Sequence, residues 1–144
     1  MIEHHLRIEW NDFVSSGASA FADGQYDRAE AMLRAAVKKI PEKADSSNFL
    51  SVIAENLGEI FTRQFRYSKA ERVYKRALLA YRNEFGVRDK NSVRIIYKLA
   101  ALYVLQRRPH LADVWYKKGF ALASATGNLE VVHHLEYMMI YITA

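Results

Sequence analysis

The sequence predicts an all-α fold in which pairs of helices stack into a solenoid, and three observations carry this prediction. First, one segment occurs three times, most weakly in its third copy, at residues 26–36, 67–77 and 109–119. Second, each copy has an anchor alanine: Ala29, Ala70 or Ala112. These alanines are 41 and 42 residues apart (70−29=41; 112−70=42), a spacing that is typical of helical repeats. Third, no segment shows the apolar–polar alternation that marks a strand.

The first helix pair is delimited by residues that end helices. An amphipathic pattern predicts a helix over residues 3–22, and Gly24 suits the left-handed conformation that closes a helix. A second helix is expected over residues 26–40. Pro41 stops it, because proline lacks the amide hydrogen that a helix interior needs.

The later helices are delimited in the same way. Residues 45–47 offer N-caps for a third helix that runs to about residue 65. Asp89 and Asn91 are cap candidates for the fifth, and Pro109 fits the first turn of the sixth, where its missing donor does no harm. The fourth to seventh expected helices cover residues 67–84, 91–107, 109–126 and 128–144.

Small residues recur where two helices should touch. Gly17 and Gly58 fall inside helical patterns, where glycine costs about 1 kcal/mol relative to alanine. We therefore expect a close helix–helix approach at both positions, opposite the anchor alanines. The large residues that should fill the space beside them are Leu33, Tyr74 and Tyr116.

Each anchor segment belongs to a longer pattern, of the form W-x2-L-G-x2-Y, then A-x3-F, then P. The first copy is Phe13, Ser16, Gly17, Ala20, Ala29, Leu33, Ala36 and Pro41. The second is Ala54, Leu57, Gly58, Phe61, Ala70, Tyr74 and Ala77. The third is Ile96, Leu99, Ala100, Tyr103, Ala112, Tyr116 and Gly119. Over roughly residues 10–125 the chain therefore resembles a three-repeat tetratricopeptide protein.

The resemblance implies a right-handed α-solenoid of three helix-turn-helix repeats plus a C-terminal capping helix over residues 128–144. Residues 1–144 would form a single domain, with repeats at approximately 10–43, 51–84 and 93–126. Ser16, Ala100 and the lack of a closing proline in copies two and three depart from the pattern. The step exceeds the usual one of about 34 residues. This lengthening, with the loop over residues 84–89, resembles the kinesin-light-chain subtype.

The bulk properties favour a folded interaction protein. Hydrophobic residues make up 51% of the chain and charged ones 26%, which excludes a disordered composition. There is no cysteine, the first residues carry charges rather than a signal sequence, and no stretch is apolar enough to span a bilayer. We expect a cytoplasmic protein that does not contact membranes. A net charge of +5 is compatible with an acidic partner.

No motif of an enzyme, cofactor or metal site is found. The six glycines are assigned to helix contacts and turns, so no phosphate-binding loop remains. Adjacent histidines, at residues 4–5 and 133–134, point about 100° apart on a helix and cannot share a metal ion as residues i and i+4 can. Glu55 and Glu59 have the spacing of an acid–base pair, but Arg63 lies at i+4 from Glu59 and can pair with it. We therefore predict a protein that is not an enzyme and has no cofactor or metal.

The resemblance implies a peptide-binding groove lined by the first helix of each repeat. Its expected residues are Asn11, Val14, Phe21, Glu55, Asn56, Glu59, Arg63, Arg94, Tyr97 and Lys98. Asn56, Arg94 and Lys98 resemble part of a clamp that holds a peptide carboxylate in some family members. Val14 and Ala18, however, stand where its first-repeat members would be. The favoured interpretation is that Arg94 and Lys98 pair with Glu55 and Glu59 on the neighbouring helix.

The predicted function is a module that binds another protein or a peptide, acidic in one version of the hypothesis, in this groove. A self-assembling scaffold and a small secretion-type chaperone are the alternatives. Nucleic-acid binding is not expected, although tyrosines interleave with a basic stretch: Tyr74, Lys75, Arg76, Tyr81, Arg82 and Arg88. The last expected helix is apolar on most sides, which predicts a homodimer interface at Tyr137, Met138, Ile140 and Tyr141.

Overall fold

The computed structural model describes the backbone of residues 2–38 and 47–127, and the side chains of residues 12–38, 51–125 and 127. Over this part the chain is helical and contains no strand, as predicted. The helices are α1 (Ile2–Ala22), α2 (Tyr26–Lys38), α3 (Ser47–Arg63), α4 (Tyr67–Phe85), α5 (Lys90–Leu105) and α6 (Pro109–Thr126). Their bounds lie within about two residues of the predicted ones. The expected helix over residues 128–144 lies outside the described residues.

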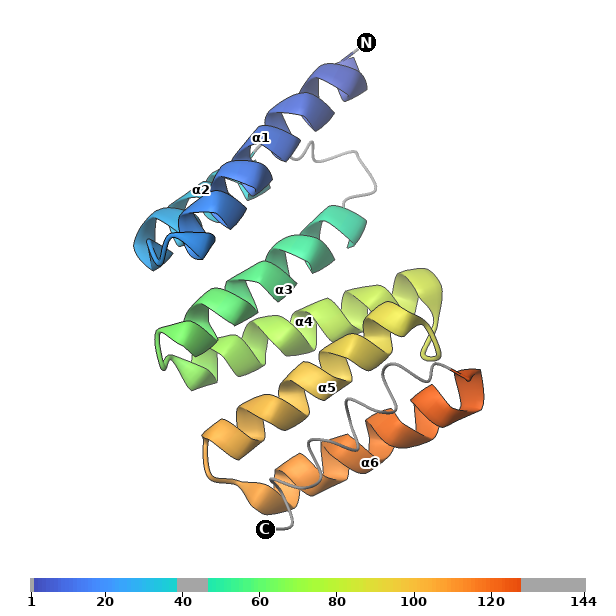
Figure 1. Cartoon of the computed structure of the whole chain (residues 1–144). Coiled ribbons are helices and arrows are strands. Elements are labelled where there is room, and N and C mark those ends of the chain that lie inside the picture. The colour runs from blue at the N-terminus through green and yellow to red at the C-terminus, as the bar shows by residue number, and fades with distance from the viewer. Residues whose placement is uncertain (1, 39–46, 128–144) are drawn as a thin grey trace.

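The six helices form a right-handed solenoid of antiparallel pairs (Figure 1). The partners within the pairs are α1 with α2, α3 with α4, and α5 with α6. Adjacent pairs meet where α2 contacts α3 and where α4 contacts α5. Helices α1, α3 and α5 line the face that Figure 1 presents to the viewer. None of the described helices is long and apolar enough to cross a membrane.

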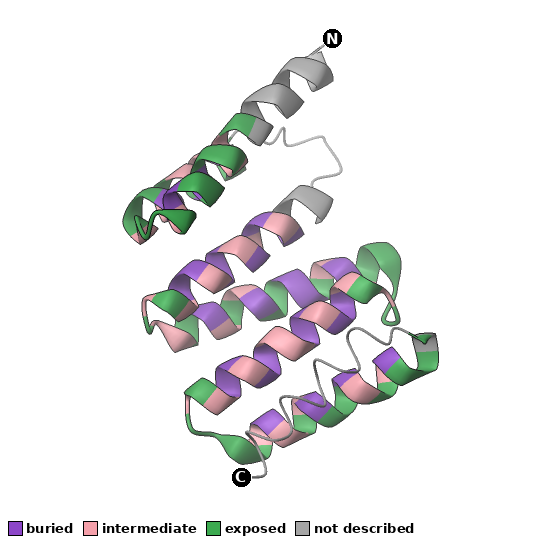
Figure 2. Ribbon diagram, viewed as in Figure 1, coloured by how far each residue is buried: buried purple, intermediate pink, exposed green. Residues whose placement is uncertain are grey.

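The predicted helix contacts are confirmed. Ala29, Ala70 and Ala112 are completely buried, and the buried residues lie on the sides of the helices that face one another (Figure 2). Gly58 lies so close to Tyr74 that an added Cβ would meet the aromatic ring. At Gly17 the same Cβ would come within 3.3 Å of Leu33 Cγ. The two glycines therefore permit close approaches of unequal tightness.

Each helix pair is connected by one short turn, and the three turns have the same geometry. In the first, the Gly24 amide donates to the Phe21 carbonyl and the Gln25 amide to that of Ala20. The same two hydrogen bonds occur in the later turns. Their donors are the amides of Phe65 and Arg66 in the second turn and those of Arg107 and Arg108 in the third. This is the bonding of the Schellman motif, whose central residue is left-handed. The backbone φ is +76° at Gly24, +61° at Phe65 and +57° at Arg107.

The two later turns are each covered by a guanidinium group. Arg66 lies over the Phe61 ring at 4.9 Å, and Arg108 lies over the Tyr103 ring at 5.4 Å. Schellman turns commonly have an apolar contact between these two positions. Here a cation–π contact takes its place and adds stability at a partly exposed site.

The start of α5 follows the prediction in part. Asp89 is its N-cap, and the carboxylate accepts from the Asn91 amide at 2.8 Å. Asn91, the second predicted cap, lies inside the helix, where its side-chain oxygen accepts from Arg94 Nη1 at 2.8 Å. The prediction for Asn91 was wrong because Asp89 already satisfies the first turn.

Candidate functional site

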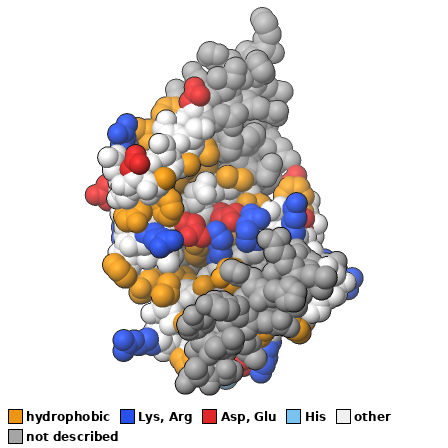
Figure 3. All heavy atoms as spheres, in the orientation of Figure 1, with side chains coloured by type: hydrophobic (Ala, Val, Ile, Leu, Met, Phe, Trp, Pro, Cys, Tyr) orange, Lys and Arg blue, Asp and Glu red, His pale blue; other side chains and the backbone are white. Residues whose placement is uncertain are grey.

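The α1–α3–α5 face has a charged centre formed by α3 and α5. The carboxylate of Glu55 accepts two hydrogen bonds from Arg94, from Nε at 2.7 Å and from Nη2 at 2.8 Å. Lys98 Nζ lies 3.2 Å from the same carboxylate and also bonds Glu59. The hydroxyl of Tyr81, on α4, donates a hydrogen bond to the Glu55 carboxylate at 3.0 Å. In Figure 3 this group forms a band of alternating acidic and basic side chains across the middle of the molecule.

Burial and charge oppose each other at Glu55. Burial alone raises the pKa of this carboxyl, but the bonds from Arg94, the Lys98 charge and the Tyr81 hydroxyl lower it, with a net pKa below the ordinary 4.5. Burial and the Glu55 charge raise the pKa of Tyr81 to about 12. Burial and the Glu59 charge likewise raise the pKa of Tyr74. Glu55 is therefore ionised and both tyrosines are neutral at neutral pH.

The pairing of Arg94 and Lys98 with Glu55 and Glu59 confirms the favoured interpretation of these four residues. Two positive and two negative groups leave the centre of the face without net charge. Arg94 and Lys98 are part-buried, with 40% and 21% of their side chains exposed. The prediction that Arg63 pairs with Glu59 was wrong: Arg63 is exposed, and among the described residues Lys98 is the ion-pair partner of Glu59.

A small hollow of about 120 Å³ opens beside this charged centre, between α1 and α3. Its floor is mostly apolar, and two polar side chains stand at one side. The lining residues are Gly17, Ala18, Phe21, Leu33, Asn56, Glu59 and Ile60. Three of them, Phe21, Asn56 and Glu59, were predicted as groove residues. Leu33 was expected to pack between helices, and the sequence pattern did not single out Ile60; both side chains are almost completely buried.

The other predicted groove residues have more structural surroundings. Val14 is half-buried and packs against the main core. Tyr97 is half-buried against Val93 and Ala100. The side chain of Asn11 lies outside the described residues, and so does the interface predicted for the last helix: Tyr137, Met138, Ile140 and Tyr141. The structure thus brings Phe21, Asn56 and Glu59 together at one hollow, and Glu55, Arg94 and Lys98 in one ion network.

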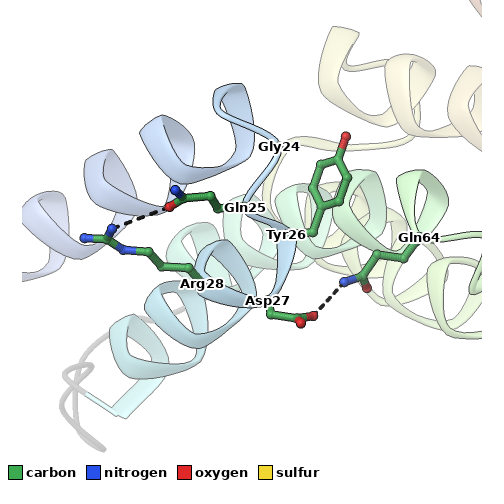
Figure 4. A pocket seen from close by; sticks show the side chains of 6 residues that line it. All are labelled: Gly24, Gln25, Tyr26, Asp27, Arg28 and Gln64. Atoms are coloured by element: carbon green, nitrogen blue, oxygen red, sulfur yellow. Dashed lines mark hydrogen bonds between the residues drawn. The ribbon is translucent and has the colours of Figure 1, made fainter.

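A wider hollow of about 430 Å³ lies at the turn between α1 and α2 (Figure 4). Its lining residues are Gly24, Gln25, Tyr26, Asp27, Arg28 and Gln64. Gln64 Nε2 donates to Asp27 at 3.0 Å, and Arg28 reaches Gln25 at 3.5 Å. Sequence reasoning missed this hollow. The signal for it was the repeat step, which places the end of α3 beside the preceding turn.

Stacking of nucleic-acid bases on Tyr74 and Tyr81 is not compatible with the structure. Only 2% of Tyr74 and 3% of Tyr81 is exposed. Within the described ranges, no group of three or more histidine, cysteine, aspartate or glutamate residues could hold a metal ion. The paired histidines at 4–5 and 133–134 have side chains outside those ranges.

The comparison with protein families agrees with this geometry. A family model described as tetratricopeptide repeat matches residues 49–125, which is more than half of the chain. The chain belongs to the tetratricopeptide repeat family. The match starts within α3 and ends within α6, so it covers the second and third helix pairs. The kinesin-light-chain subtype stays a prediction.

Solved structures share the tetratricopeptide fold at low identity. The Rap conjugation gene regulator of plasmid pLS20, in complex with the Phr* peptide, superposes with a TM-score of 0.83 at 13% identity, over 98% of this chain and 39% of that one. The apo quorum sensor NprR from B. thuringiensis gives 0.76 at 21% identity, over 90% and 36%. The N-terminal domain of stress-induced protein-1 from C. elegans gives 0.68 at 14% identity, over 91% and 97%.

These similarities establish the fold of the tetratricopeptide chain and nothing further. The chain spans less than two thirds of the length of the Rap and NprR chains. No protein of curated function matches the sequence.

Proposed function

We propose that this tetratricopeptide chain is a protein-interaction module that holds an extended segment of a partner protein on its α1–α3–α5 face. The observation that carries the proposal is the hollow between α1 and α3. Phe21, Leu33 and Ile60 give it an apolar lining, and Asn56 stands at its side. Pockets for alternate side chains, combined with polar groups that meet the backbone, suit an extended peptide.

In this proposal an apolar side chain of the peptide occupies the hollow. Asn56 is half-buried, and the structure shows no hydrogen bond of its side chain to any described residue. A carboxamide can both donate to and accept from a peptide backbone. Asn56 would therefore fix the peptide's direction, and the hollow would select a side chain.

The ion network defines what the centre of the face prefers. Because Glu55 and Glu59 neutralise Arg94 and Lys98, a charged peptide group would have to displace an existing pair. Displacing one partner of such a pair leaves the other charge part-buried and unpaired. The free energy lost in this way exceeds what a new surface contact contributes. We therefore assign an uncharged peptide segment to this face, and not a carboxylate clamp.

The similarity to known structures supports the class of ligand. The Rap regulator, whose structure contains the Phr* peptide, has the same helical architecture along nearly all of this chain. Shared architecture at 13% identity does not transfer a particular peptide or contact. It supports only the proposal that a peptide or protein segment is the partner.

Peptide selection from a random displayed library tests the proposal. Ala18→Leu would fill the hollow from an exposed position of α1, and Asn56→Ala would remove the polar group. We expect selected peptides to bind each variant about tenfold more weakly, which corresponds to ~1.4 kcal/mol. Ala31→Leu, on the exposed side of α2, is the matched control. Peptides that bind all three variants like the parent chain would refute the proposal.

Several finer statements stay predictions beside this one. They are a single domain over residues 1–144, repeats at 10–43, 51–84 and 93–126, a cytoplasmic location and the absence of catalysis. Assembly into a homodimer through residues 137–142 is also a prediction. Light scattering over a wide concentration range, on the full chain and on a chain ending at Gly127, measures whether those residues associate.

A further inference from the structure

Two of the three turns along one edge of the solenoid carry an unbalanced positive charge, whereas the first turn and the start of α2 have Asp23 and Asp27. The turns between α1 and α2, α3 and α4, and α5 and α6 follow one another along this edge (Figure 1). We call residues 63–69 and 105–111 the turn edge. These two segments contain no aspartate or glutamate. They contain five cationic residues, a number equal to the net charge of +5 of the whole chain: Arg63, Arg66, Lys69, Arg107 and Arg108.

The charges of the turn edge are mostly unmatched, in contrast to those between α3 and α5. Among the described residues only Arg66 has an ion-pair partner, Glu30 at 3.4 Å. Arg63, Lys69 and Arg107 are exposed. Like charges gathered on one edge repel each other, and a partner of opposite charge relieves that repulsion and is attracted from a distance.

Two exposed apolar side chains lie among these cations. Phe65 is 77% exposed and Leu105 is 51% exposed. A large apolar side chain within a charged rim is the usual composition of a protein contact. In Figure 3 basic and apolar side chains are visible along the lower part of the left margin of the molecule, whereas its upper part also has acidic ones.

Phe65 is costly for the folded chain in a second way. Its φ of +61° is left-handed, at the position where the first turn has Gly24 (65−24=41). Left-handed backbone costs a residue with a Cβ about 1–2 kcal/mol. Stability alone would favour glycine here, so neither exposure nor conformation accounts for a phenylalanine. Strain of this kind at an exposed residue motivates a hypothesis of binding.

We propose that the turn edge docks an acidic segment of a partner protein that carries an aromatic or aliphatic side chain. Carboxylates of the segment pair with Arg63 and Arg107, since guanidinium–carboxylate bonds are the strong charge-assisted ones. The apolar side chain lies against Phe65 and Leu105. The hollow in Figure 4 adjoins this surface through Gln64, the neighbour of Phe65, and is also lined by Asp27, so the acidic segment is placed outside it.

A protein partner fits this surface better than a nucleic acid. Single-stranded nucleic acids stack successive bases on several aromatic rings. The turn edge has one exposed phenyl ring, Phe65, and the smaller exposed imidazole of His110. Tyr67 is half-buried in a T-shaped contact with Phe65, at 6.3 Å and 86°. The surface is separate from the α1–α3–α5 hollow, so it stands independently of the groove proposal.

Fluorescence anisotropy with a labelled peptide tests the docking surface. The probe is a peptide of about twelve residues in which glutamates flank a central leucine, and its matched control has glutamines in place of glutamates. We expect Arg63→Ser with Arg107→Ser to weaken binding about five- to tenfold, as two exposed ion pairs would. Arg72→Ser with Arg76→Ser removes the same charge from exposed positions of α4 and should change binding less than twofold.

Phe65→Gly separates binding from folding. We expect this variant to unfold at higher denaturant, because glycine adopts the left-handed turn without strain, yet to bind the probe about tenfold more weakly. Asn56→Ala should leave probe binding unchanged. No binding by the parent chain, equal losses in both arginine pairs, full binding by Phe65→Gly, or tighter binding of a single-stranded oligonucleotide than of the peptide would each overturn the proposal.

Discussion

Tyr74 lies with its ring against Gly58, so that the Cβ of an alanine at 58 would fall 2.6 Å from Tyr74 Cζ. The ring is 2% exposed, and it is held between α3 and α4 in the second repeat. The first repeat has Leu33 opposite Gly17 at a looser 3.3 Å. One repeated position thus has different tolerances in different copies.

This contact predicts that Gly58→Ala destabilises the chain although alanine is the better helix former. The overpacking cost of about 1–3 kcal/mol exceeds the helix gain of about 1 kcal/mol. Gly17→Ala should change stability by less than about 1 kcal/mol, since the Leu33 side chain can shift. Urea unfolding measures both. Adding Tyr74→Leu to Gly58→Ala should recover part of the loss, and a purely additive double variant would contradict a direct clash.

The left-handed turn positions predict a pair of opposite effects. Gly24→Ala should cost about 1 kcal/mol through the backbone alone, because the new Cβ would meet no atom within 4 Å. Arg107→Gly should gain a similar amount, because it places glycine at a φ of +57°. Denaturant midpoints of the two variants give the comparison. Changes of the same sign would mean that the turns do not share one conformation.

Glu55 predicts a loss of stability in acid. Its folded-state pKa is below the ordinary value of 4.5, so its contribution is present above pH 4.5 and is lost as the pH falls through the folded value. Glu55→Gln should lower the free energy of unfolding by about 1–2 kcal/mol at pH 7, because the ion pair with Arg94 is lost. The cost is no larger because Arg94 is partly exposed to water. The substitution should also flatten the stability profile below pH 4.5. Glu71, whose pKa is lowered too, would leave some acid dependence. An unchanged acid limb would contradict the role given to Glu55.

Tyr81 predicts the corresponding behaviour in base. Its folded-state pKa is raised to about 12 from 10, so its stabilising contribution is complete below pH 10 and is lost as the pH rises toward 12. Tyr81→Phe should cost about 1 kcal/mol at pH 7, the value of one buried hydrogen bond. It should also reduce the fall in stability between pH 10 and 12. Chemical denaturation at several pH values, with the parent chain as reference, measures both effects.

The fold could be predicted from the sequence because the repeat fixes it at several levels at once. The anchor alanines, the helix-contact glycines and the turn residues all indicate the same helix pairs. The sequence also predicted the pairing of Glu55 with Arg94 and of Glu59 with Lys98. Both pairs are 39 residues apart, close to the repeat step of 42 that places α5 beside α3.

The candidate site was less predictable, because it depends on how side chains fill space between repeats. Pattern positions placed Val14 and Tyr97 in the groove, whereas packing turns both partly into the core. No pattern identified Tyr81 as a partner of Glu55, since the contact comes from the second helix of the repeat. Phe65 and Arg107 were missed because a left-handed closing residue was predicted only at a glycine, Gly24, although the repeat step from Gly24 points to both.

Binding of a partner segment at the hollow between α1 and α3 can be located residue by residue with NMR shift mapping. A library-selected peptide would be added to isotope-labelled full-length chain. We expect the largest amide and side-chain shifts to cluster at Ala18, Phe21, Asn56 and Ile60. Shifts confined to α2, α4 and α6, with these four residues unchanged, would contradict binding at this hollow.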